Sequence, residues 1–130
     1  MNKRIWIVPL LIVAVNALAI ALRWGSLSDP LPAHFDLDGN ASDEMPRNML
    51  LMYPLIAAGV CGLSYLVARF KNKFNTPLVI LSSGISLILL FSTMVTLTAG
   101  KAPIFMLAEP VILLASVVAA VISILRLREA

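Results

Sequence analysis

Long apolar segments alternate with short polar segments along this chain. Four apolar runs dominate it, at about residues 5–24, 48–68, 77–98 and 104–126. Each run is close to the roughly 20 residues that a helix needs to cross a bilayer. Because a lone strand in lipid would leave its backbone polar groups without partners, each run is expected to be a helix. The pattern predicts an all-α integral membrane protein, a four-helix bundle that forms a single membrane domain over residues 1–130.

Composition supports the same class. Hydrophobic residues make up 60% of the 130 residues and charged residues only 13%, whereas about a quarter of the residues in a soluble domain are charged. Ala17-Leu18-Ala19 resembles a signal-peptide cleavage site, but it lies inside a run longer than the usual 7–15 residues of a signal core. We therefore expect the first run to be a retained membrane span.

Positive charge is distributed unevenly between the two ends of the predicted bundle. Seven of the ten lysines and arginines fall on the side that holds both termini, and three fall on the other side. By the positive-inside rule, both termini are predicted to be cytoplasmic and residues 25–47 to form an outer loop. The seven are Lys3, Arg4, Arg69, Lys71, Lys73, Arg126 and Arg128, and the three are Arg23, Arg47 and Lys101. This basic surplus is a topology signal, and without a basic-aromatic stripe it predicts no nucleic-acid partner.

The predicted outer loop is the only long polar segment and concentrates the side chains suited to recognition. Five of the seven acidic residues fall between Asp29 and Glu44, together with the sole histidine. A turn is expected at Gly39-Asn40. The sequence therefore predicts a structured loop with a binding site for a ligand or partner. Its candidate residues are Pro32, His34, Phe35, Asp36, Asp38 and Gly39.

A metal site is the first alternative for this loop. Asp36, Asp38 and Asn40 match the first positions of an EF-hand calcium loop, which also needs glycine at the sixth position and glutamate at the twelfth. Ala41 and Arg47 occupy those two positions, so an EF-hand is excluded. A looser divalent-metal site with His34, Asp36 and Asp38 as ligands stays open, although one histidine with carboxylates is a weak signal. No cofactor is predicted otherwise.

Glu109 is a second candidate site residue. If the last helix begins near Ile104, this carboxylate lies within the membrane, where an ionisable group suggests a functional site. If the helix begins at Pro110, Glu109 lies at its N-terminus, where negative charge is favoured. Asn16 lies at mid-membrane depth, and we expect it to hydrogen-bond to a neighbouring helix. With the hydroxyl-rich run 77–98, these groups open the alternative of a polar path in a small transporter or transporter subunit.

Small residues one helical turn apart occur in several runs, such as Ala58 with Gly62 and Ala115 with Ala119. Such pairs let helices approach closely. They predict tight packing, either within the chain or against further copies or another membrane protein. No nucleophile has a recognisable setting, and no phosphate loop, kinase or zincin signature is present. The chain is therefore predicted not to be an enzyme, with a metal-dependent membrane hydrolase as the remaining catalytic alternative.

The outer loop carries a recognisable string, Leu31-Pro32-Ala33-His34-Phe35-Asp36-Leu37-Asp38-Gly39, between two apolar runs. This string resembles the motif of a bacterial membrane family, domain of unknown function 1648. Pro32, His34, Phe35, Gly39 and Pro54 match that motif residue by residue. Asp36 stands where asparagine is common in the family. The resemblance covers about residues 5–68.

The resemblance implies a functional context that the residues alone do not. The same domain occurs at the front of an immunity and signalling protein that protects bacteria from the Sdp killing-factor toxin. By this resemblance we expect a multi-pass protein of the bacterial cytoplasmic membrane that recognises a partner or ligand at the outer face through residues 30–44. Toxin immunity or membrane signalling is its most concrete form, with a peptide toxin as the expected partner. Family membership does not by itself fix function.

Overall fold

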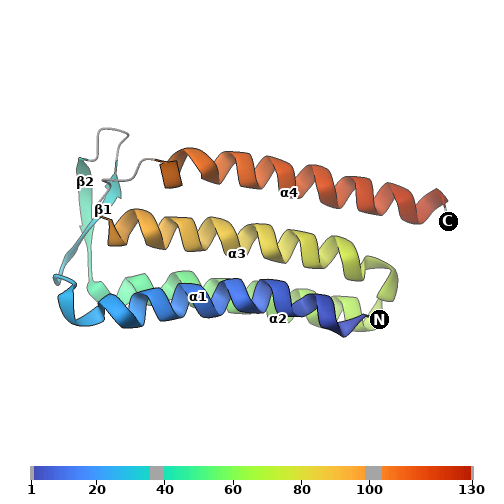
Figure 1. Ribbon diagram of the computed structural model, residues 1–130, viewed down its shortest axis with the longest axis horizontal. Coiled ribbons are helices and arrows are strands. Elements are labelled where there is room, and N and C mark those ends of the chain that lie inside the picture. The colour runs from blue at the N-terminus through green and yellow to red at the C-terminus, as the bar shows by residue number, and fades with distance from the viewer. Residues whose placement is uncertain (1, 36–39, 99–103, 130) are drawn as a thin grey trace.

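The computed structural model describes residues 2–35, 40–98 and 104–129. Its main elements are four long helices and two short strands (Figure 1). They are α1 (Ile7–Arg23), β1 (Leu31–Phe35), β2 (Ala41–Met45), α2 (Met52–Phe70), α3 (Asn75–Leu97) and α4 (Ile104–Glu129). All four helices are long and apolar enough to cross a membrane. The predicted all-α membrane class with four helices is confirmed.

Helix α3 lies at the centre of the bundle. It packs between α4 on one side and the pair α1 and α2 on the other (Figure 1). A β-carbon added to Gly84 of α3 would overlap the side chain of Ser116 on α4, so these two helices approach closely at that point. Elsewhere α4 is largely uncovered, and Ala120 is the only described side chain of this helix that is buried. The bundle is therefore a three-helix unit with a fourth helix alongside α3.

Proline positions fit the helices in which they lie. Pro9, Pro54 and Pro77 each lie within the first three residues of a helix, where no backbone hydrogen bond is lost. Pro110 is different because it lies inside α4, which begins at Ile104. The structure therefore adopts the first of the two arrangements considered for Glu109, in which this residue lies within the helix.

Two apolar clusters hold the two ends of the bundle. One consists of the buried Ile20, Leu31, Leu50 and Leu97, and the other of Trp6, Ala68 and Val79. Between them the buried side chains include several small polar ones, namely Asn16, Ser82, Ser86 and Thr93. The large apolar side chains instead cover the outside of the helices. This distribution is typical of membrane helices, whose interfaces are rich in small and hydroxyl residues while lipid contacts the large apolar ones.

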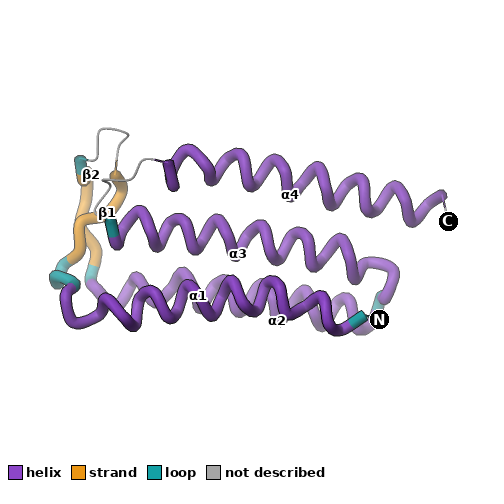
Figure 2. Tube along the Cα trace, in the orientation of Figure 1, coloured by secondary structure: helices purple, strands orange, loops and turns teal. Residues whose placement is uncertain are grey.

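The strands lie at one end of the bundle, which we call the hairpin end (Figure 2). Both chain termini and the connection Asn72–Phe74 between α2 and α3 lie at the opposite end, which we call the terminal end (Figure 1). The strands β1 and β2 pair antiparallel, with Leu31 opposite Met45 and Phe35 opposite Ala41. The predicted recognition segment thus contains a β-hairpin that lies across the ends of the helices.

Candidate functional site

The hairpin is fixed to the bundle by the apolar side chains at its base. Leu31 is only 3% exposed and belongs to the same cluster as Ile20, Leu50 and Leu97. Its cross-strand partner Met45 packs against this cluster as well. Because side chains alternate between the two faces of a strand, burial of this pair fixes which face of the hairpin rests on the helices.

Polar contacts close the base of the hairpin. The backbone N–H of Arg47, just after β2, donates a hydrogen bond of 3.2 Å to Oδ1 of Asp29, just before β1. The Arg47 guanidinium lies over the Trp24 ring, 4.6 Å from its centroid. Such a cation–π contact stabilises by about 0.5–2 kcal/mol, depending on exposure. These contacts connect the segment that follows α1 to the segment that precedes α2.

The second strand of the hairpin carries exposed charge. Pro32 and Glu44 form a cross-strand pair, and both are exposed. Asp43 is exposed too, and its Oδ1 accepts a hydrogen bond of 2.8 Å from the Glu44 backbone N–H. Two adjacent carboxylates are thus available to a partner in the water layer. These two residues were not among the predicted site residues, although their position in the acidic segment was the available signal.

The predicted site residues fall into three groups. Pro32, His34 and Phe35 all lie on β1, and of these three only the Pro32 side chain is described. Asp36, Asp38 and Gly39 lie outside the described residues. Glu109 lies on α4, close to its hairpin-end terminus.

A metal site built on His34, Asp36 and Asp38 stays a prediction, since two of these residues and the side chain of the third are not described. Within residues 2–35, 40–98 and 104–129, no group of three or more histidine, cysteine or acidic side chains could hold a metal ion. The described residues therefore contain no further candidate metal site.

Glu109 makes a specific contact inside the membrane-spanning part of the chain. The Ser92 hydroxyl of α3 donates a hydrogen bond of 2.9 Å to Oε1 of Glu109. The cations predicted on its side of the membrane are Arg23, Arg47 and Lys101. Lys101 lies outside the described residues, and the Arg47 guanidinium lies over Trp24. Among the described residues, the hydrogen-bond partner of the Glu109 carboxylate is therefore the Ser92 hydroxyl.

A second polar contact crosses the bundle one residue further along α3. The Thr93 hydroxyl lies 2.7 Å from Oδ1 of Asn16 on α1 and 3.0 Å from the carbonyl oxygen of Leu89. It can donate to one of these acceptors at a time. Asn16 is fully buried, so the expected hydrogen bond to a neighbouring helix is confirmed. Its amide nitrogen has no partner among the described residues.

Comparison with known families identifies the same part of the chain, namely α1, the hairpin and the start of α2. Residues 10–58 match the family model for a domain of unknown function, DUF1648. This part of the chain is similar to DUF1648 domains. The resemblance predicted from the Pro32-to-Gly39 string is therefore confirmed. The DUF1648 match includes the whole hairpin and Pro54, whereas α3 and α4 lie outside it. No curated protein and no solved structure matches the chain.

Proposed function

We propose that this chain is a non-enzymatic protein of the bacterial cytoplasmic membrane that recognises a partner at the outer face through residues 30–44. The observation that carries this proposal is the anchored hairpin. Leu31 holds it on the helix ends, while Asp43 and Glu44 are exposed on its second strand. A rigid scaffold that presents exposed side chains at a membrane surface is suited to binding.

The distribution of charge supports the outward orientation of the hairpin. Lys3, Arg4, Arg69, Lys71 and Lys73 are all exposed at the terminal end. The hairpin end instead carries Asp29, Asp43 and Glu44 beside Arg23 and Arg47. Cytoplasmic segments carry an excess of lysine and arginine. The terminal end would thus be cytoplasmic, which leaves the hairpin facing outward.

The surface of the hairpin favours a cationic, extended partner. Its exposed carboxylates on β2 would attract a basic peptide and steer its approach. A two-stranded sheet also has outer strand edges, and an extended peptide can pair with such an edge through main-chain hydrogen bonds. Immunity to a peptide toxin, the role suggested by the family resemblance, is the most concrete function that would use both the exposed carboxylates and the strand edge. Membrane signalling triggered by such a peptide has the same requirements.

Binding is favoured over catalysis by the setting of the described acidic side chains. General acid–base catalysis relies on two groups held in different environments within a closed site. Asp43 and Glu44 are instead adjacent and both exposed to water. Their setting suits reversible recognition of positive charge.

The test is affinity purification of the chain from native membranes in mild detergent, followed by mass spectrometry of the retained proteins and peptides. The paired change Asp43→Asn with Glu44→Gln removes the two exposed charges and keeps the side-chain shapes. We expect it to lower retention of the partner about tenfold, as the loss of close charge pairs does at other interfaces. His34→Ala with Asp38→Ala is expected to act in the same direction.

The matched control is Lys71→Gln with Lys73→Gln, which removes two exposed charges at the terminal end. This variant is expected to keep the partner. Equal retention by all three variants would contradict recognition through the hairpin. Retention of no specific partner by the unaltered chain would contradict it as well.

A second candidate function is transport, because polar contacts run along α3. Ser92 contacts Glu109 on α4, and Thr93 contacts Asn16 on α1. Intramembrane carboxylates often mark proton or cation pathways. If this function holds, Glu109→Gln abolishes cation or proton flux in vesicles and Glu109→Asp retains part of it. Absence of flux with the unaltered chain would exclude transport by this chain alone.

A further inference from the structure

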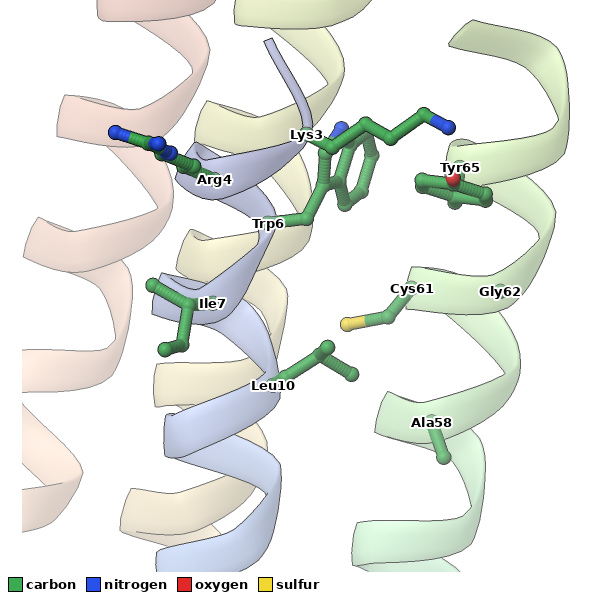
Figure 3. A pocket seen from close by; sticks show the side chains of 9 residues that line it. All are labelled: Lys3, Arg4, Trp6, Ile7, Leu10, Ala58, Cys61, Gly62 and Tyr65. Carbon is green, nitrogen blue, oxygen red and sulfur yellow. The ribbon is translucent and has the colours of Figure 1, made fainter. Parts of the chain in front are cut away.

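A cavity opens between the first turns of α1 and the middle of α2, at a distance from the hairpin. Its volume is about 750 Å³, within the roughly 300–1,000 Å³ of small-molecule sites. Trp6 and Leu10 form the wall on the α1 side, and Ala58, Cys61 and Tyr65 form the wall on the α2 side (Figure 3). We call this cavity the α1–α2 groove.

Small residues on α2 create the groove. Ala58 and Gly62 are one helical turn apart and lie on its wall with Cys61. A β-carbon added to Gly62 would meet nothing within 4 Å, so the space beside it is open. Both α1 and α2 pack more extensively on α3 than on each other. The groove is therefore a gap between two helices that faces away from α3, toward the lipid.

The end of the groove near the N-terminus is rigid. Trp6 is 4% exposed, and its ring meets Tyr65 edge-on with 5.5 Å between ring centroids. The indole N–H donates a hydrogen bond of 2.7 Å to Oδ1 of Asn75, whose amide in turn donates to the carbonyl oxygen of Asn2 at 3.2 Å. Because this end is held by hydrogen bonds and a ring contact, the groove is formed before any ligand binds.

Lys3 lies at the mouth of the groove, where its side chain extends toward Tyr65, whereas the Arg4 side chain extends to the other side of α1 (Figure 3). Lys3 and Arg4 are part of the groove lining and both are exposed. Among the described residues, neither forms an ion pair with an acidic side chain. Arg69, also exposed, follows Tyr65 by four residues on α2 and so lies one turn beyond it on the same face. The groove thus combines an apolar wall with an unneutralised positive mouth at the end of the membrane span.

We propose that the α1–α2 groove binds one anionic membrane phospholipid, with an acyl chain along the apolar wall and the phosphate group at Lys3. From Lys3 to Leu10 the chain rises about 10 Å along the helix, which spans the interface and the adjoining acyl region. Basic pockets between membrane helices on the cytoplasmic side are suited to acidic headgroups. Aromatic side chains such as Trp6 and Tyr65 favour the same depth. Charge complementarity selects this occupant over an uncharged helix, which would leave Lys3 without a partner.

Native mass spectrometry of the full chain, with phosphatidylglycerol or phosphatidylcholine added in equal amounts, tests the proposal. The unaltered chain is expected to retain one phosphatidylglycerol and to prefer it over phosphatidylcholine. Lys3→Gln with Arg4→Gln should weaken retention of phosphatidylglycerol about tenfold, since each cation near a membrane surface favours an anionic headgroup. Its control, Lys71→Gln with Lys73→Gln, removes two charges at the same end outside the groove and should leave retention unchanged.

Gly62→Leu provides an independent test, because leucine would fill the groove. Its control is Gly59→Leu on the same helix, where an added β-carbon also meets nothing within 4 Å but which does not line the groove. We expect Gly62→Leu to abolish retention and Gly59→Leu to preserve it. Equal retention of the two lipids by the unaltered chain would overturn the proposal. A dimer of the unaltered chain that Gly62→Leu dissociates would overturn it too, by identifying a second copy as the occupant.

Discussion

Gly84 and Ser116 form a close approach between α3 and α4, since a β-carbon on Gly84 would occupy the space of the Ser116 side chain. Helix α4 packs mainly on α3, so this point is part of the contact that holds the fourth helix. Small residues at membrane helix contacts allow such approach without a cavity.

Gly84→Ala is therefore expected to separate α3 from α4 and to lower the free energy of unfolding by about 1–3 kcal/mol, as overpacking does elsewhere. Equilibrium unfolding in detergent micelles measures this change. Adding Ser116→Gly should restore most of the loss. Gly59→Ala is the control, because its added methyl group meets open space. Equal stability of the Gly84→Ala and Gly59→Ala proteins would contradict close packing of α4 at this point.

The Asn16–Thr93 contact is expected to couple α1 to α3. In a double-mutant cycle, Asn16→Leu and Thr93→Val should show a coupling energy of about 0.6–1.7 kcal/mol, between the average and the maximum measured for hydrogen bonds between membrane helices. Thr96→Val is the control partner, because the Thr96 hydroxyl donates to the Ser92 carbonyl oxygen of its own helix at 3.3 Å. Coupling of Asn16 to Thr96 as large as that to Thr93 would count against the contact.

Leu50 is expected to anchor the hairpin together with Leu31, since both belong to one buried cluster. Leu50 is fully buried, whereas its neighbour Leu51 is 46% exposed. Leu50→Ala should cost about 2–5 kcal/mol because it leaves a cavity, and Leu51→Ala should stay within about 0.5 kcal/mol. Hydrogen exchange of the β1 and β2 amides measures the local effect. Unchanged protection in the Leu50→Ala protein would show that the hairpin is held by other contacts.

Glu109→Gln is expected to leave the stability unchanged or to raise it by at most about 3 kcal/mol. A glutamine oxygen can accept the Ser92 hydrogen bond, and the change removes the cost of a charge in the membrane. Unfolding in micelles again provides the measurement. A clear loss of stability would instead mean that a positive group neutralises the Glu109 carboxylate in the folded protein.

Much of the fold follows from the sequence because the membrane restricts the choices. Lipid forces each long apolar run to be a helix, and a buried amide such as Asn16 has to find a partner on another helix. The domain was also predictable, because the Pro32-to-Gly39 string follows directly on a first membrane span and lies within the matched region.

The hairpin could not be predicted as strands from its own residues. Ala41, Asp43 and Glu44 are of types that are depleted in strands, and Pro32 cannot donate a backbone hydrogen bond. The pairing depends instead on Leu31 and Met45, which rest together on the ends of the helices. Such contacts link positions far apart in the sequence, so no local sequence pattern predicts them.

The α1–α2 groove could not be predicted from the sequence either. The small residues Ala58 and Gly62 indicated close helix packing, and the structure instead leaves open space beside Gly62. Whether a small residue lets two helices approach or leaves a gap depends on where the neighbouring helix lies. That position is set in this bundle by α3, on which α1 and α2 both pack.

Recognition through the hairpin is tested most directly by photo-crosslinking in intact cells. A photoreactive amino acid placed at Glu44 on the exposed face of β2 would be compared with the same residue placed at Lys71 at the opposite end of the bundle. The account predicts a specific crosslinked peptide or protein from position 44 and none of that mass from position 71. Crosslinks to lipid alone from position 44, or the same partner from both positions, would contradict it.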